Sequence, residues 1–320
     1  MYLHSIEFSE KEALVDIDDA ARSEAEYPMA AGLKKDGFKH FIKCRSDIIE
    51  LSRQAVAKIC PLQLIGVDAV IYSTDSSWEN NITAMDGIDS CLPAQGQRNG
   101  LLSVLDDFGL NVIPYGVNFS ACDNLGRALC LAKALLNSQT HANILVIIGD
   151  KTEPGYSRFT LSGSALYSDC VGAFILSDKK PEQKSYLVES ISYEIGCAIS
   201  KLELSASMKK MMHTKKMIKG LKDKFAQIGH QDQRLPADYD KVIMGHYNDD
   251  FVESMCVMLE VDTKNVVREY SRDYAHCYAI DPLIALKNLP GDENIVDGET
   301  VLQLTSAAEM TTLCGYRFCE

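Results

Sequence analysis

The sequence predicts an α/β fold made of two tandem βα halves. Two observations lead to this prediction. Amphipathic stretches of helical length alternate with short apolar stretches of strand length along most of the chain. A polar break at residues 177–182 divides this alternation. We therefore expect an N-terminal half over residues 1–180 and a C-terminal half over residues 181–320.

In the first half, periodicity predicts a helix at 48–59, a strand at 67–72, a helix at 97–108, an extended piece from 111, a helix from Cys122 to about 137, and strands at 142–150 and 168–176. The 142–150 segment is apolar almost throughout, which is typical of a strand buried on both faces.

The second half shows the same alternation of helix-like and strand-like segments, with a different sequence. It predicts an extended segment at 186–195, a lysine-rich helix at 204–226, a strand at 241–244, a helix at 249–259, a further segment from 266, a helix opening at Asp281, and final strands at 299–304 and 315–318.

Composition narrows the class of protein. The chain is 46% hydrophobic and 24% charged, with a net charge of −13, and an acidic chain is a poor partner for nucleic acid. No stretch is apolar enough for a membrane helix, and the acidic N-terminus does not resemble a signal peptide. The 11 cysteines include no CxxC pair and no zinc-like spacing. We therefore expect a cytoplasmic protein with reduced cysteines and no metal.

A basic stretch interrupts this acidic chain. Its lysines are Lys209, Lys210, Lys215, Lys216, Lys219, Lys222 and Lys224. Such a helix is a candidate docking site for a phosphorylated or acidic partner, and a solvated helix face is the structural alternative.

Cys122 is the candidate nucleophile. It lies where a strand gives way to a helix, and the free N–H groups and positive dipole of a helix start favour a thiolate. A buried structural cysteine on the first turn is the alternative.

His246 and Asp281 are candidates for the base and its partner. His246 follows the 241–244 strand, where an imidazole can reach a cleft and exchange protons near neutral pH. Asp281 precedes Pro282, a pattern typical of a helix cap. A carboxylate there can also orient an imidazole, as the third member of a triad does.

Several segments, in this order, resemble ketoacyl synthase III enzymes of the thiolase superfamily. Residues 119–129 (FSACDNLGRAL) resemble the nucleophile segment, 144–150 (ILVIIGD) the next strand, 167–173 (YSDCVGA) the Gly-Asp-Gly-Ala-Gly-Ala turn, and 245–248 (GHYN) the Pro-His-Gln-Ala-Asn motif. The resemblance implies a thiolase fold, two tandem βα halves in a five-layered α-β-α-β-α arrangement, and a homodimer. It also implies Cys122 as nucleophile and His246 as base.

Two departures from this family bear on the chemistry. Condensing members have Gly-Asn-Thr-Ser after the histidine motif, whereas this chain has residues 274–282 (YAHCYAIDP). Distance from His246 places His276 at the asparagine position, and alignment to the following helix favours Asp281, which is our preferred third residue. The segment 306–312 (SAAEMTT) lacks the glycines that supply an oxyanion N–H in the family, but from the resemblance we still expect a backbone N–H of this segment, together with that of Cys122, to fill this role.

An ionised carboxylate cannot donate a hydrogen bond to an enolate, so loss of the asparagine disfavours carbon–carbon bond formation. We expect an acyltransferase of secondary metabolism that moves an acyl group from an acyl carrier protein or coenzyme A thioester, through Cys122, to a hydroxyl or amine. No cofactor is bound permanently, and Lys215 and Lys219 are the candidate contacts to the carrier. The alternatives are a condensing enzyme that uses His246 and His276, and a non-catalytic partner subunit.

Overall fold

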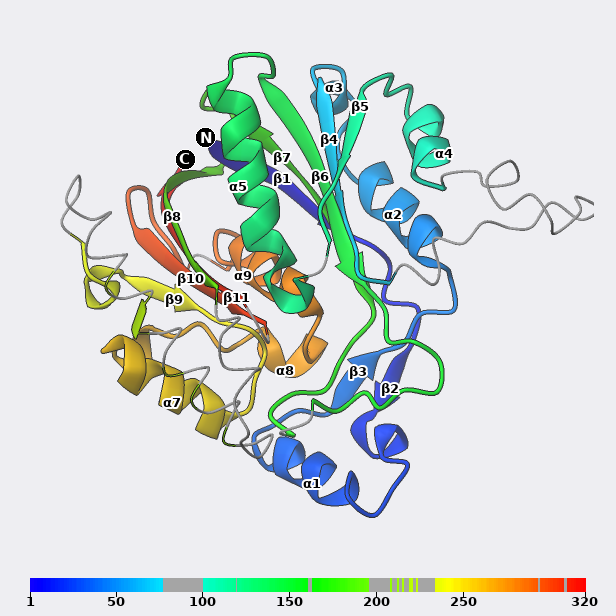
Figure 1. Ribbon diagram of the computed structural model, residues 1–320, viewed down its shortest axis with the longest axis vertical. Coiled ribbons are helices and arrows are strands. Elements are labelled where there is room, and N and C mark those ends of the chain that lie inside the picture. Colours follow the sequence, from blue (N-terminus) through cyan, green and yellow to red (C-terminus); the bar gives the residue numbers. More distant parts are fainter. Residues whose placement is uncertain are drawn as a thin grey trace, which may run out of the picture.

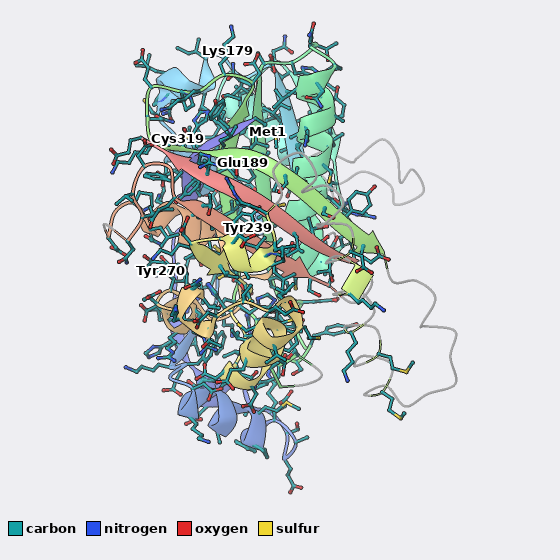
Figure 2. The ribbon with its side chains drawn as sticks, turned by 90° about the vertical axis from the view of Figure 1, so that its left-hand side faces the viewer. Met1, Lys179, Glu189, Tyr239, Tyr270 and Cys319 are labelled. Carbon is teal, nitrogen blue, oxygen red and sulfur yellow. The ribbon has the colours of Figure 1, made fainter. Side chains whose placement is uncertain are left out.

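The structure is a computed structural model that describes residues 1–76, 100–118, 120–160, 163–195, 234–292, 294–307 and 310–320, and six further positions between 208 and 223. Figure 1 shows the arrangement of its helices and strands, and Figure 2 shows the side of the C-terminal half.

The N-terminal half contains β1 (Tyr2–Phe8), β2 (Leu14–Asp16), α1 (Tyr27–Lys35), β3 (His40–Ile42), α2 (Ile48–Ala57), α3 (Pro61–Leu64), β4 (Ala69–Ser73), α4 (Gly100–Asp107), β5 (Ile113–Gly116), α5 (Asn124–Asn137), β6 (Asn143–Asp150) and β7 (Cys170–Ser177). The helices and strands expected here from periodicity are present, with ends that differ by a few residues.

The C-terminal half contains β8 (Ser185–Ile195), β9 (Lys241–Ile243), α7 (Asp249–Leu259), α8 (Ser271–Tyr274), α9 (Asp281–Asn288), β10 (Thr300–Ser306) and β11 (Met310–Cys319). Position 180 falls in the connection between β7 and β8. Most of the expected lysine-rich helix lies outside the described residues.

Within the described residues, nine strands form one sheet in the order β5-β4-β6-β7-β1-β8-β11-β10-β9. Its two sides have the same pairing pattern. From β1 outward, β1–β7 and β7–β6 are antiparallel and β6–β4 is parallel. From β8 outward, β8–β11 and β11–β10 are antiparallel and β10–β9 is parallel. The sequence indicates a tandem repeat only through the alternation of helices and strands, whereas the strand directions repeat from one side of the sheet to the other. The two sides join where β1 pairs with β8.

Helices cover both faces of each side and produce the expected five layers (Figure 1). α2 packs on β6, β7 and β1, whereas α5 packs on β4 and β6 and also reaches β8 and β11. α5 therefore lies between the two sides of the sheet, and α9 contacts β1. α7 packs its Val252, Met255 and Leu259 against strands β9, β10 and β11.

The central position of α5 follows from its apolar stripe. Leu125, Ala128, Leu129 and Ala132 are fully buried. Burying one leucine side chain contributes about 1.5–3 kcal/mol to stability, so this stripe holds the helix, and the turn before it, in place.

The first strand is a feature that periodicity did not predict. β1 alternates too irregularly for a strand signal, with His4 and Ser5 inside it and a register shift between His4 and Glu7. Its central position comes from pairing with β7 and β8, which are distant in sequence.

Candidate active site

The candidate active site lies where the N-terminal ends of the two central helices meet. A short 3₁₀ turn, Ala121–Asp123, leads into α5, and a second one, Tyr278–Ile280, leads into α9. The two turns contact each other. Cys122 on the first and Asp281 at the start of α9 are thereby brought together from the two halves of the chain.

The Cys122 thiol contacts His276. Cys122 Sγ lies 3.0 Å from His276 Nε2, which is hydrogen-bonding distance for a sulfur and an imidazole nitrogen. The other ring nitrogen, Nδ1, bonds the Asp281 carboxylate. Cys122 is partly exposed, and His276 and Asp281 are buried. Nucleophile, imidazole and carboxylate thus form a continuous chain with the geometry of a catalytic triad.

Asp281 is held by donors from several directions. Besides His276, it accepts hydrogen bonds from the backbone N–H groups of His246 and Cys277, each at 2.6 Å. Burial by itself would raise the pKa of Asp281, but the two histidines hold it below its usual value of 3.8. Asp281 is the first residue of α9 rather than its cap, so its carboxylate is available to these donors.

His246 shares the same carboxylate but is positioned differently. Its Nδ1 lies 2.6 Å from the Ala275 carbonyl oxygen and 3.2 Å from Asp281 Oδ1. A carbonyl oxygen can only accept, so Nδ1 carries the proton and donates. Burial lowers the pKa of His246 against the opposing effect of Asp281. His246 is therefore neutral at physiological pH, and the 3.2 Å approach of its Nδ1 to Asp281 is not an ion pair.

His276 has the opposite charge preference. Burial by itself would lower its pKa, but Asp281 and Cys122 raise the pKa of His276 to about 10. The imidazole between a carboxylate and a thiol is thus readily protonated. It can take a proton from the group that bonds its Nε2 and hold it as an imidazolium.

Aromatic side chains surround His276. The rings of Tyr167 and Tyr247 lie with their centroids 5.4 Å and 5.0 Å from that of His276. Tyr278 stacks on Tyr167 at 4.6 Å, with an interplanar angle of 8°. Burial raises the pKa of Tyr167 and of Tyr247, so both remain neutral phenols. They screen the imidazole from water on the sides that face neither the thiol nor the carboxylate.

Strained backbone flanks the same residues. Ala121, Ala275 and Tyr278 have φ values of +44°, +51° and +55°, in the region that favours glycine. Such strain concentrates at functional sites, where surrounding contacts maintain it. No local pattern marks these positions in the sequence, because alanine and tyrosine have no special preference for this conformation.

The β10–β11 hairpin borders the nucleophile turn from the other side. Asp123, directly after the nucleophile, is fully buried and accepts hydrogen bonds from Thr305 Oγ1 at 2.6 Å and Thr312 Oγ1 at 2.8 Å. The hairpin includes the segment 306–312, for which we expected an oxyanion role. Residues 308–309 of that segment lie outside the described residues, and this role stays a prediction.

Cys122, His276 and Asp281 therefore form one chain of contacts, and His246 contacts this chain at Asp281. Our preferred sequence-based set joined Cys122, His246 and Asp281. In the structure both imidazoles contact Asp281, but the hydrogen bond to the Cys122 thiol comes from His276. His246 instead donates its backbone N–H to the same Asp281 oxygen that His276 bonds, and its Nδ1 lies 3.2 Å from the other oxygen.

Lys215 and Lys219 are exposed and helical in the structure. The other lysines of the basic stretch lie outside the described residues. Across the described part of the chain, no three histidine, cysteine or acidic side chains are grouped to hold a metal ion. No helix in that part has the length and apolar character needed to cross a bilayer.

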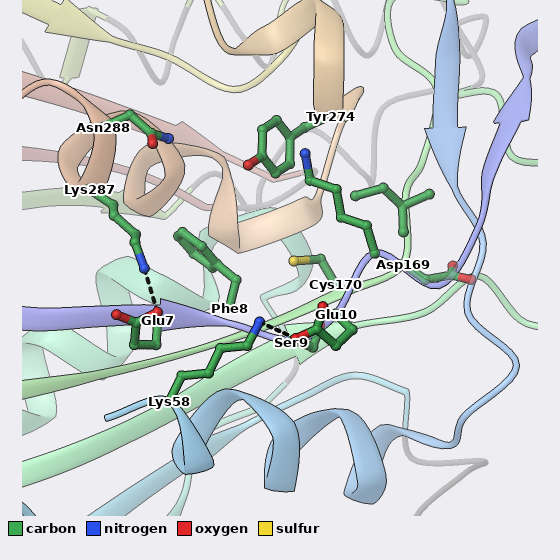
Figure 3. Close-up of a pocket in the computed structure, with 12 residues that line it drawn as sticks. Glu7, Phe8, Ser9, Glu10, Lys58, Asp169, Cys170, Tyr274, Lys287 and Asn288 are labelled. Atoms are coloured by element: carbon green, nitrogen blue, oxygen red, sulfur yellow. Dashed lines mark hydrogen bonds and ion pairs between the residues drawn. The ribbon is translucent and has the colours of Figure 1, made fainter. Parts of the chain in front are cut away.

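A cavity of about 330 Å³ lies elsewhere, between β1, α2 and α9 (Figure 3). Four of its six charged groups pair with one another, Lys287 with Glu7 and Lys58 with Glu10 at 2.7 Å, and Asp169 pairs with Arg158 at 2.9 Å. Lys11 Nζ lies 3.5 Å from the centre of the Tyr274 ring. Because these charges already have partners, and Cys122 does not line this cavity, we do not assign the chemistry to it.

Comparisons with known proteins agree on the fold. No protein-family model and no curated protein sequence matches the chain. Among solved structures, ChlB3, described as an acyltransferase, matches with a TM-score of 0.76 and 15% identity, over 99% of this chain and 97% of that one. The ketoacyl-acyl carrier protein synthase III of Thermus thermophilus matches with a TM-score of 0.73 and 16% identity, over 99% of each chain.

A variant of OleA from Xanthomonas campestris matches with a TM-score of 0.71 and 10% identity, over 99% of this chain and 97% of that chain. The coverage is nearly complete in every case, although the identity is low. The chain therefore has the thiolase fold in its ketoacyl synthase III-like form.

Proposed function

We propose that the protein is an acyltransferase that carries its acyl group on Cys122. Cys122 Sγ attacks the carbonyl carbon of an acyl thioester while His276 Nε2 takes the thiol proton. The bond between the acyl carbon and the carrier sulfur breaks, and the imidazolium returns its proton to that leaving thiol. A hydroxyl or amine then attacks the acyl-enzyme, His276 takes its proton, and the proton passes to Cys122 as the thioester bond breaks.

The chain of contacts from thiol to imidazole to carboxylate carries this proposal. Cys122 Sγ lies 3.0 Å from His276 Nε2, and Asp281 bonds the opposite nitrogen. This differs from the sequence-based expectation in assigning the base to His276. The reason is reach: a general base must lie within hydrogen-bonding distance of the proton that it takes.

The carboxylate supports an oxygen or nitrogen acceptor. Asp281 is ionised and accepts from every neighbour for which a hydrogen bond is described, so it offers no proton to an enolate. It instead makes His276 a stronger base, which suits deprotonation of an alcohol or amine. The similarity to ChlB3, itself described as an acyltransferase, is consistent with this choice.

The donor is an acyl carrier protein or coenzyme A thioester, as we expected from the sequence. Exposed Lys215 and Lys219 are suited to the phosphate or acidic surface of such a donor. A cytoplasmic homodimer is the form that we propose for the enzyme.

Intact-protein mass spectrometry after incubation with a panel of acyl-coenzyme A thioesters tests the acyl-enzyme step. Wild type should gain the mass of one acyl group, located on Cys122 by peptide mapping, and Cys122→Ala should gain none. Exposed Cys60 serves as the internal control for non-specific transfer. An absence of adduct with every thioester would favour a non-catalytic subunit instead.

A condensing activity is the second candidate. It is favoured by the presence of two imidazoles on one carboxylate, because protonated His276 can donate to an enolate oxygen while the Nε2 lone pair of neutral His246 can take a proton from the carbon that becomes nucleophilic. Product analysis separates the two activities, since only condensation makes a new carbon–carbon bond.

A further inference from the structure

The turn that carries Cys122 is strained at the residue before it. Ala121 has φ of +44°, and its side chain is exposed, so no packing of the methyl group maintains this conformation. A non-glycine residue in this region stores conformational energy and relaxes unless a contact holds it. Relaxation would rotate the next residue, Cys122, away from His276.

One carboxylate bonds the strained residue directly. Asp75 Oδ2 accepts the backbone N–H of Ala121 at 2.6 Å. Asp75 belongs to the segment that follows β4, and β4 is parallel to both β5 and β6 in the sheet. The bond therefore ties the nucleophile turn to a rigid strand end.

The Asp75 segment is itself anchored from the end of β6. Asp150, fully buried, accepts the backbone N–H groups of Asp75 at 2.7 Å and Ser76 at 3.0 Å through one oxygen. Hydroxyl groups of Thr74 and Ser76 donate to the same oxygen. Because backbone and side-chain donors of three consecutive residues converge on one buried anchor, the position of Asp75 is fixed before any substrate arrives.

We infer that Asp75 is a positioning residue for the nucleophile: it holds Ala121 in the left-handed conformation that directs the Cys122 thiol onto His276. The inference rests on the proposed function in taking Cys122 as the nucleophile. It adds a residue that the triad does not contain and that acts only through the backbone.

The test measures the rate at which iodoacetamide alkylates Cys122 in the full-length chain, by peptide mass spectrometry, with exposed Cys60 as internal reference. Asp75→Ala should slow alkylation of Cys122 about tenfold relative to Cys60, because the turn relaxes and the thiol loses its imidazole. Asp75→Asn, whose amide oxygen still accepts the N–H, should stay within about threefold of wild type.

Rescue separates positioning from a general structural role. Ala121→Gly added to Asp75→Ala should restore most of the rate, because glycine adopts φ of +44° without strain. Asp262→Ala, which removes a similar carboxylate-to-backbone bond at Lys264, is the matched control and should leave the Cys122 rate unchanged.

A wild-type rate for Asp75→Ala, or failure of Ala121→Gly to rescue it for any reason, overturns the inference. Alkylation reports on the thiol and not on acyl transfer. If these rates follow the expected pattern while wild type forms no acyl adduct, the proposed function fails and the positioning role of Asp75 stands.

Discussion

At the scale of the residue, the role of each imidazole depends on what its Nδ1 touches. His276 Nδ1 bonds a carboxylate, which leaves Nε2 beside the thiol as a strong base. His246 Nδ1 bonds the Ala275 carbonyl oxygen, and burial keeps this ring neutral. Two histidines that share Asp281 therefore have different chemistry.

His276→Gln and His246→Gln should separate these roles. His276→Gln removes the group that takes the thiol proton, so alkylation of Cys122 by iodoacetamide at pH 7 should fall by about 10²-fold. His246→Gln keeps its backbone N–H bond to Asp281 and should stay within about threefold of wild type. A larger loss for His246→Gln than for His276→Gln would restore His246 as the base.

Asp123 gives a prediction for stability. Burial outweighs the bonds from Thr305 and Thr312 and raises the pKa of Asp123 from 3.8 to about 7. Between these values the folded chain binds a proton that the unfolded chain lacks, so this group's contribution to stability is lost as pH rises towards 7. Asp123→Asn cannot ionise. The free energy of unfolding of Asp123→Asn minus that of wild type should therefore be more positive at pH 8 than at pH 5, by about 1 kcal/mol or more.

Urea unfolding of wild type and Asp123→Asn at pH 5 and pH 8 measures this difference. Burial also raises the pKa of Asp150 to about 7, but Asp150 is present in both proteins, so its contribution cancels. Asp262→Asn is the control without a pH effect in this range. Hydrogen bonds from Lys264 lower the pKa of Asp262 below 3.8, so this carboxylate is ionised at both pH 5 and pH 8 and its removal should change stability equally at both. An Asp123→Asn effect that is equal at both pH values would contradict the prediction.

At the scale of the element, the close approach of α5 to β11 sets the depth at which the nucleophile turn lies. A Cβ on Gly126 would lie 2.4 Å from Thr312 Oγ1 and 2.6 Å from Thr312 Cβ. Only glycine allows this separation of helix and strand, and the same threonine bonds Asp123. Thr312 of the hairpin therefore packs against α5 and also bonds the turn before it.

Gly126→Ala should destabilise the protein by about 1–3 kcal/mol, because Thr312 or the helix must move. Gly32→Ala in α1 is the matched control: no atom lies within 4 Å of its Cβ, and alanine should stabilise the helix by about 0.5–1 kcal/mol. Urea midpoints of both variants measure the effects. A Gly126→Ala protein as stable as wild type would show that α5 can shift freely.

At the scale of the whole molecule, the two halves contribute to one site through a shared sheet. The antiparallel β1–β8 pairing aligns them, and the central helices α5 and α9 then place Cys122 beside Asp281. Within the C-terminal half, Glu189 of β8, labelled in Figure 2, accepts hydrogen bonds from Arg317 of β11 at 2.8 Å and from Arg234 at 2.6 Å.

The charge distribution leads to a prediction about the carrier. The chain has a net charge of −13, so an acidic carrier protein approaches it against repulsion except near the basic stretch. Lys215→Glu with Lys219→Glu should raise KM for a carrier-bound substrate several-fold, about tenfold at low ionic strength, with little effect on kcat. The control is Lys179→Glu with Lys264→Glu, which makes the same change in charge at other exposed lysines. Equal KM values for the two double variants would remove the docking role.

The sequence by itself determined the elements with strong local patterns. The short run of β6 is apolar throughout, which is typical of a strand buried on both faces, and the stripe of α5 follows the 3.6-residue period of a helix. The position of Cys122 ahead of that helix, and the order of the motifs, indicated the thiolase fold. The choice between Asp281 and His276 as the third residue could not be made this way, because both lie in one short segment with no regular period.

Tertiary structure decided what depends on contacts between distant segments. It placed irregular β1 at the centre of the sheet, and it put His276 rather than His246 against the thiol. It also revealed the strain at Ala121 and the Asp75 contact, which join residues 46 positions apart. The physical reason is that side-chain direction at helix starts and loops is set by backbone angles and by neighbours from other elements, and neither is written in the local pattern of residues.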